Sequence, residues 1–121
     1  MALAKLGVVV LECPDPDALA GFYAQVLGGT VEREQDGQWV DLAVPGGQAL
    51  AFQRSADHTP PRWPAPEGAM QFHLDLTVPD LDAAEEGVLK LGATPLDTAD
   101  RSRAFRVYAD PAGHPFCLCA C

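Results

Sequence analysis

Basic residues are scarce in this sequence. Eight Lys and Arg stand against seventeen Asp and Glu, which gives a net charge of −9. Such a chain repels phosphate backbones and anionic lipid surfaces, so we expect no nucleic acid and no membrane among its partners. The apolar run near the N-terminus is too short to span a bilayer and lacks a small-residue cleavage pattern, which favours a cytoplasmic location.

Cysteine is also infrequent, with four residues in the chain. In the cytoplasm we expect reduced thiols, because cellular reductants keep them so. Cys117, Cys119 and Cys121 alternate along a predicted strand, where their Cα atoms would lie about 6.6 Å apart with parallel side chains. Because that spacing is near the upper limit for a disulfide, the sequence predicts none there.

What the chain does contain is an internal repeat. The stretch "VVVLECPDPDALAGFYAQVLGGT" at 8–30 aligns with "HLDLTVPDLDAAEEGVLKLGAT" at 73–94, so that Asp15 falls on Asp80 and Asp17 on Asp82. Farther on, Gly47 falls on Gly113. Two copies of one supersecondary unit explain this order. With 121 residues, of which 48% are hydrophobic, the chain is predicted to form a single domain over 1–121.

Each copy is predicted to form a strand, a helix and three further strands. In the first copy, Asp15 can cap a helix with Pro16 at its first position, and Gly28 can end it. In the second copy, Asp80 is the expected cap and Gly92 the expected stop. The first unit is predicted over about 6–54 and the second over about 70–121. The segment 55–69 between them carries four prolines and is predicted to be a stiff linker.

These motifs resemble those of the vicinal oxygen chelate superfamily. The resemblance rests on "LAGFYAQVLGG", "FHLDLTVPDLDAA" and "YADPAGHPFCL", and it covers roughly residues 6–121. The superfamily includes glyoxalase I, extradiol dioxygenases, fosfomycin-resistance enzymes and bleomycin-resistance proteins, and this chain is most similar to small bacterial glyoxalase-like domains. The resemblance implies an α+β fold in which two tandem βαβββ units form rolled half-barrels around a cavity. It also implies a homodimer.

Metal enzymes of the superfamily take one ligand from the first strand and one from the last strand of each unit. The matching positions here are His73 and Cys117 in the second unit and Val8 and Ala51 in the first. Valine and alanine have no lone pairs to donate, so the pattern is incomplete. We therefore expect no complete divalent-metal site and no other cofactor, and a metal held through His73 plus other ligands stays the alternative.

Strand alternation suggests which side chains line the cavity. It places His73 and Asp75 on one face, where a carboxylate beside an imidazole could support acid-base catalysis or could simply be a polar lining. Phe105 and Tyr108 are expected to pack in the core. The candidate ligand-binding residues are Val8, Glu12, Trp39, Ala51, Gln53, Trp63, Cys117 and Cys119.

Three functions follow from these observations. The first is the binding of a small organic molecule between the two units, and the acidic residues favour a cationic or hydrophobic compound. The second is a lyase or isomerase activity, either metal-dependent through His73 or metal-free with His73 and Asp75 as the acid-base pair. The third is a non-catalytic interaction module whose pocket is filled by side chains.

Overall fold

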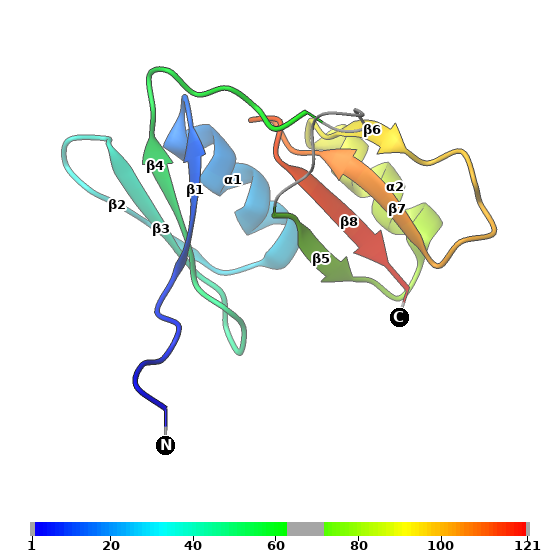
Figure 1. Cartoon of the computed structure of the whole chain (residues 1–121), viewed down its shortest axis with the longest axis horizontal. Coiled ribbons are helices and arrows are strands. Elements are labelled where there is room, and N and C mark those ends of the chain that lie inside the picture. The colour runs from blue at the N-terminus through cyan, green and yellow to red at the C-terminus, as the bar shows by residue number, and fades with distance from the viewer. Residues whose placement is uncertain (1, 63–71, 121) are drawn as a thin grey trace. The chain divides into compact units, whose positions relative to one another are not determined.

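The chain divides into two compact units, Met1–His58 and Thr59–Cys121 (Figure 1). A computed structural model describes residues 2–62 and 72–120. Each unit combines one helix with one four-stranded sheet, which confirms the predicted α+β class. The predicted borders of the units and of the linker 55–69 stay predictions, because residues 63–71 lie outside the described part.

The first unit follows the predicted order of a strand, a helix and three strands. Its elements are β1 (Val9–Cys13), α1 (Pro16–Leu27), β2 (Thr30–Arg33), β3 (Trp39–Ala43) and β4 (Leu50–Arg54). The strands lie in the sheet in the order β1-β4-β3-β2. β1 runs parallel to β4 and the other pairs are antiparallel, so the first and last strands of the unit meet side by side.

The second unit repeats this topology. Its elements are β5 (Leu74–Thr77), α2 (Leu81–Lys90), β6 (Thr94–Asp97), β7 (Phe105–Ala109) and β8 (Pro115–Cys119). The order in the sheet is β5-β8-β7-β6, and again the first and last strands run parallel while the other described pairs are antiparallel. The internal repeat is therefore a repeat of structure as well as of sequence.

Both helices begin where the sequence predicts. The Asp15 carboxylate accepts a hydrogen bond from the Ala18 backbone N–H at 3.2 Å, with Pro16 at the first helical position. Asp80 accepts from the backbone N–H groups of Asp82 and Ala83 at 3.0 and 3.2 Å. These carboxylates satisfy N–H groups that have no partner within the helix. The first helix ends at Gly28 as predicted, whereas the second ends with Leu91 as its cap, one residue before the expected Gly92.

Each helix buries one face of its own sheet. In the first unit, the fully buried Phe52 of β4 stacks on Tyr23 of α1 with ring centroids 5.8 Å apart. In the second unit, Tyr108 of β7 and Phe116 of β8 are fully buried with centroids 5.6 Å apart. Tyr108 therefore belongs to the core, as predicted.

A charged network lies between α2 and the strand β7. The Tyr108 hydroxyl donates to Glu85 at 2.7 Å, and Arg101 donates to both carboxylate oxygens of Glu85 at 3.0 and 2.8 Å. The buried Arg106 guanidinium lies 2.9 Å from Asp82 and 3.7 Å from Glu85. These hydrogen bonds, that from Arg101 above all, lower the pKa of Glu85 from 4.5 to about 2.

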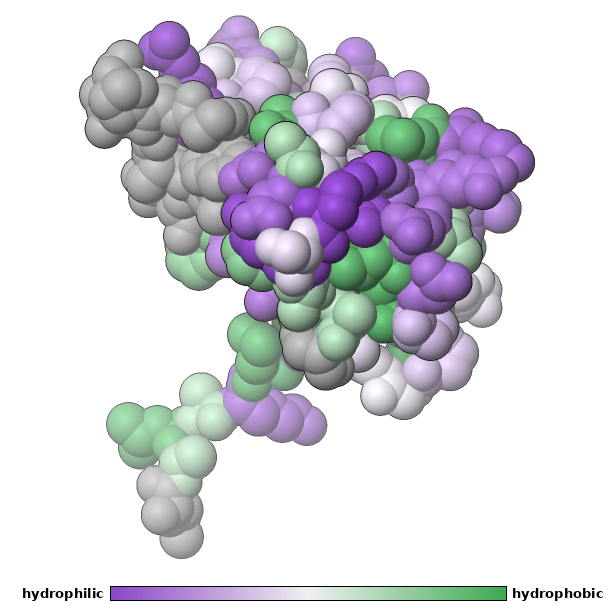
Figure 2. Space-filling view, turned by 90° about the vertical axis from the view of Figure 1, so that its right-hand side faces the viewer, coloured by the Kyte–Doolittle hydropathy of each residue, from purple (hydrophilic) through white to green (hydrophobic). Residues whose placement is uncertain are grey.

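The segment 2–7 extends from the first unit with no regular structure. Leu3 and Leu6 in it are exposed, and the segment is visible at the bottom of Figure 2 as a mainly green extension. Within the described residues, neither helix is long and apolar enough to cross a membrane.

Candidate functional site

The face of each sheet opposite its helix carries the candidate site residues; we call it the helix-free face. In the second unit, Tyr108 contacts α2, so residues in its cross-strand row, such as Phe116, lie on the helix side. The adjacent row alternates to the helix-free face. Its members are Asp75, Cys117, Val107 and Asp97.

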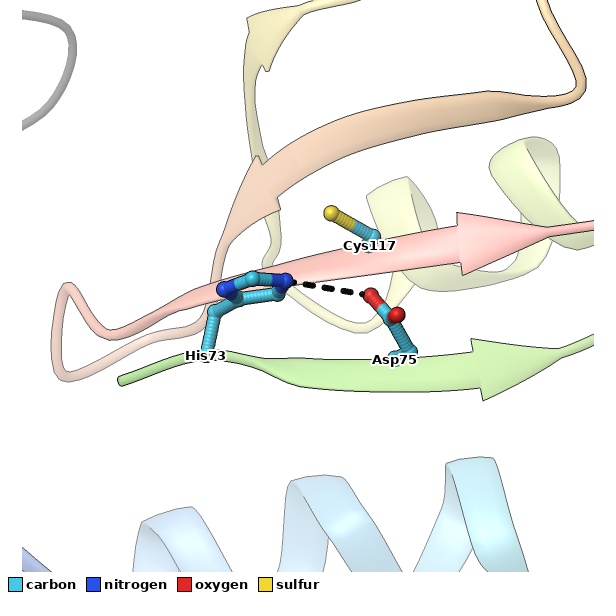
Figure 3. Close-up of side chains that lie close together, drawn as sticks. All are labelled: His73, Asp75 and Cys117. Atoms are coloured by element: carbon cyan, nitrogen blue, oxygen red, sulfur yellow. Dashed lines mark ion pairs between the residues drawn. The ribbon is translucent and has the colours of Figure 1, made fainter. Parts of the chain in front are cut away.

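Three side chains with metal-binding atoms meet on this face. His73 precedes β5 by one residue, Asp75 lies in β5 and Cys117 lies in the middle of β8, and Figure 3 shows all three on one side of the sheet. Nε2 of His73 lies 3.2 Å from Oδ1 of Asp75. One donor atom from each residue lies within 4.8 Å of the other two. The side chains of His73 and Asp75 are 36% and 66% exposed, whereas Cys117 is buried beneath them.

The Cys117 thiol is not an activated nucleophile. Burial, together with the Asp75 carboxylate next to it, raises the pKa of Cys117 to about 11. Reactive cysteines have a lowered pKa and an electropositive neighbour, and Cys117 has the opposite environment. Covalent catalysis through this thiol is therefore disfavoured, which leaves His73 and Asp75 as the acid-base candidates.

Sequence reasoning missed a second group on the same face. Arg103 donates to both carboxylate oxygens of Asp97 at 3.3 and 2.9 Å, and its guanidinium lies 4.4 Å from the centre of the Phe105 ring. Phe105 is 39% exposed, so the prediction of core packing is wrong for this residue. Phe105 and the buried Arg106 are consecutive residues of β7, so their side chains point to opposite faces. The register with β8, which pairs Phe105 with Cys119, shows that Phe105 lies on the helix-free face. Arg103 sits in a turn without periodicity, so no sequence signal identified it.

The first unit places several predicted ligand-binding residues on its own helix-free face. Glu12, Gln53 and Trp39 form one cross-strand row, and Ala51 lies in the next row of that face, between Val10 and Asp41. Ala51 is fully buried, whereas Glu12 and Gln53 are exposed. The Trp39 indole N–H donates to the Asp41 carboxylate at 3.0 Å. Asp41 was missed, although its spacing of two residues from Trp39 could have identified it.

The remaining predicted residues lie outside the rows described above. Val8 precedes β1 by one residue, and Trp63 lies outside the described residues. Cys119 pairs in register with Thr77 at the end of β8. The expectation of reduced cysteines is wrong for Cys119, which is disulfide-bonded. The prediction of no disulfide rested on the spacing of an extended strand, and β8 ends at this residue, so that spacing stops there. Cys13 and Cys117 carry thiols.

The two units share the βαβββ topology, and the second carries the donor side chains of His73, Asp75 and Cys117 on its helix-free face. The sequence model of the Glyoxalase-like domain family matches residues 8–119. The chain belongs to this family, and the predicted resemblance to the vicinal oxygen chelate superfamily is confirmed. No match was found among curated proteins.

Solved structures share this fold. A glyoxalase/bleomycin resistance protein/dioxygenase family enzyme from Burkholderia phytofirmans is 19% identical with a TM-score of 0.73, over 95% of this chain and 97% of that one. A possible glyoxalase from Bacillus cereus is 12% identical with a TM-score of 0.71, over 98% and 99%. A mutant fosfomycin resistance protein from Listeria monocytogenes, complexed with Mn(II) and 1S,2S-dihydroxypropylphosphonic acid, is 12% identical with a TM-score of 0.70, over 98% and 91%.

Proposed function

We propose that this chain binds a small organic molecule on its helix-free faces, without the divalent-metal site that draws ligands from both units. The observation that carries the proposal is the contrast between the two units. The second unit offers His73 and Cys117 at the family's ligand positions, whereas the first offers Val8 and Ala51, which have no donor atoms. That the two faces line one cavity, and that the protein is a cytoplasmic homodimer, stay predictions.

The charges on these faces favour a cationic ligand. In the first unit, Asp41 and Glu32 pair in register and Glu12 lies on the same face. The one basic residue of that unit's strand β2, Arg33, instead pairs with Asp17 of α1. The Trp39 indole adds an aromatic surface, and aromatic rings beside carboxylates bind organic cations well.

A thermal-shift series tests this proposal. We expect benzyltrimethylammonium to raise the melting temperature by several degrees at concentrations well above its Kd, because only a ligand of the native state stabilises it. Its uncharged carbon isostere should act more weakly, and phenylacetate should have no effect. Asp41→Asn should reduce the response to the cation, whereas Asp36→Asn in the β2–β3 turn serves as the matched control. A flat response to all three compounds would instead support the interaction module with a filled pocket.

A second candidate function is an enzyme of the lyase or isomerase type. The separation of 3.2 Å between His73 and Asp75, on an accessible part of the face, supports proton transfer by this pair. The carboxylate would hold the imidazole in one orientation, and the imidazole would take or deliver the proton. Such a pair suits proton abstraction next to a carbonyl group.

Replacing His73 by alanine distinguishes the two functions. If the pair is catalytic, turnover should fall by about 100-fold to 10,000-fold, the usual contribution of a general acid or base. Deuterium exchange next to the carbonyl, followed by NMR over a panel of small ketones and aldehydes, measures this loss. A binding protein should keep most of its affinity in the same variant. Wild-type protein that exchanges no compound above the buffer rate would contradict the enzyme hypothesis.

A further inference from the structure

We infer that His73, Asp75 and Cys117 form a three-ligand site for a thiophilic divalent ion of the Zn²⁺ type, complete within the second unit. The inference goes beyond the proposed function, because it does not depend on an organic ligand. It also departs from the ligand pattern of the superfamily's metal enzymes. Asp75 is not one of that pattern's four positions, and the first unit supplies no ligand.

The pairing of two strands creates this site. The parallel register of β5 and β8 places Asp75 directly beside Cys117, although the two residues are 42 positions apart in the chain. His73 stands two residues before Asp75 and projects to the same side (Figure 3). Two of the three donors thus come from hydrogen-bonded strands, which hold their backbones in fixed positions, and His73 directly precedes β5.

The distances suit a small tetrahedral ion. Zinc bonds of about 2.0 Å to nitrogen and oxygen and about 2.3 Å to sulfur place neighbouring ligand atoms roughly 3.3 to 3.5 Å apart. The separation of 3.2 Å between His73 Nε2 and Asp75 Oδ1 already has this spacing. With every pair of donor atoms within 4.8 Å, a closing movement of about 1 Å completes the arrangement.

The donor types select the ion. One imidazole nitrogen, one carboxylate oxygen and one sulfur suit Zn²⁺ or Co²⁺, whereas Mn²⁺ and Mg²⁺ prefer oxygen ligands. Three protein ligands leave a fourth position open, which is typical of catalytic zinc sites. A bound zinc ion would act there as a Lewis acid. The exposed side chains of His73 and Asp75 provide an entry path to the buried Cys117.

The first unit contains a natural comparison. Val10 and Ala51 pair in register at the positions that Asp75 and Cys117 occupy in the second unit, and Val8 corresponds to His73. None of these three side chains has a donor atom. The same strand pairing therefore presents metal-binding side chains in the second unit and side chains without donor atoms in the first.

Metal titration of the full chain tests the inference. With protein as isolated and free of reducing agent, we expect calorimetry to give one Zn²⁺ per chain and markedly weaker Mn²⁺ binding. Co²⁺ should produce a near-ultraviolet thiolate band and intense visible bands of a tetrahedral site. Cys117→Ser should abolish the near-ultraviolet band. Asp75→Asn and His73→Ala should each weaken Zn²⁺ binding by more than about 100-fold, above the range for outer-shell partners.

Matched controls make the result decisive. Cys13→Ala removes the second thiol of the described residues, and Asp36→Asn removes an exposed carboxylate in the β2–β3 turn of the first unit; both should leave Zn²⁺ binding unchanged. Because Asp75 is largely exposed, Asp75→Asn should fold normally even if Cys117→Ser does not. Zn²⁺ binding that survives Asp75→Asn, or a Co²⁺ complex without the thiolate band, would overturn the inference. Repeating the organic thermal-shift series in EDTA separates this outcome from a failure of the proposed function.

Discussion

Replacing Phe52 by alanine should lower the free energy of unfolding by about 3 to 5 kcal/mol, the usual cost of truncating a fully buried phenylalanine. The Phe52 ring projects from β4 toward α1, is fully buried, and stacks on Tyr23 of that helix. Its removal leaves a cavity on the helix side of the first sheet, which the rigid sheet and helix can fill only partly. Guanidinium unfolding followed by circular dichroism measures the loss.

Phe105→Ala is the matched control, because it makes the same truncation on a helix-free face. Phe105 is already 39% exposed, so less apolar area leaves water when the protein folds. We expect a cost below about 1.5 kcal/mol. Equal costs for the two variants would mean that the helix-free face is as tightly packed as the core, and would contradict its assignment as a ligand surface.

Replacing Glu85 by glutamine should destabilise the second unit by about 2 to 3 kcal/mol near neutral pH. Glu85 is only 16% exposed and accepts hydrogen bonds from Tyr108 and Arg101. The amide keeps the shape but removes the charge that faces the buried Arg106 guanidinium. Losing one partner of a covered charged network is costly because the buried Arg106 guanidinium is then compensated only in part, by the largely exposed Asp82 carboxylate.

The same variant should also lose part of the acid sensitivity of the wild type. The pKa of Glu85 is lowered from 4.5 to about 2 in the folded protein. Its stabilisation is therefore fully present above about pH 5 and disappears as the pH falls toward about 2. Urea unfolding at pH 7, 4 and 3 should show a difference between wild type and Glu85→Gln that shrinks with decreasing pH.

The neighbouring residue provides the control for this prediction. Glu86 is 71% exposed and pairs with Lys90 at 3.3 Å on the outer surface of α2. An exposed pair one helical turn apart contributes about 0.3 to 0.5 kcal/mol. Glu86→Gln should therefore change stability by less than about 0.5 kcal/mol at every pH. A larger effect of Glu86→Gln than of Glu85→Gln would contradict the importance of the network.

The pairing of His73 with Asp75 shows how far local sequence rules reach. Residues two apart in a strand share a face, and this rule alone predicted their proximity. The same rule placed Glu12 with the other residues of the first unit's helix-free face. The rule could not place Phe105. When both faces of a strand carry apolar residues, alternation alone does not tell which of the two faces packs against the helix.

The sequence by itself determined the two-unit repeat, the order of the elements, the capping of both helices by Asp15 and Asp80, and the face shared by His73 and Asp75. All of these depend on neighbours within a few positions along the chain, where propensity and periodicity act. The tertiary structure alone decided that Cys117 stands beside Asp75, that Arg103 pairs with Asp97 on the same face, and that Arg106 lies buried under α2. These contacts are set by strand register and by the helix docking on its sheet, which join residues distant in sequence and leave no local pattern.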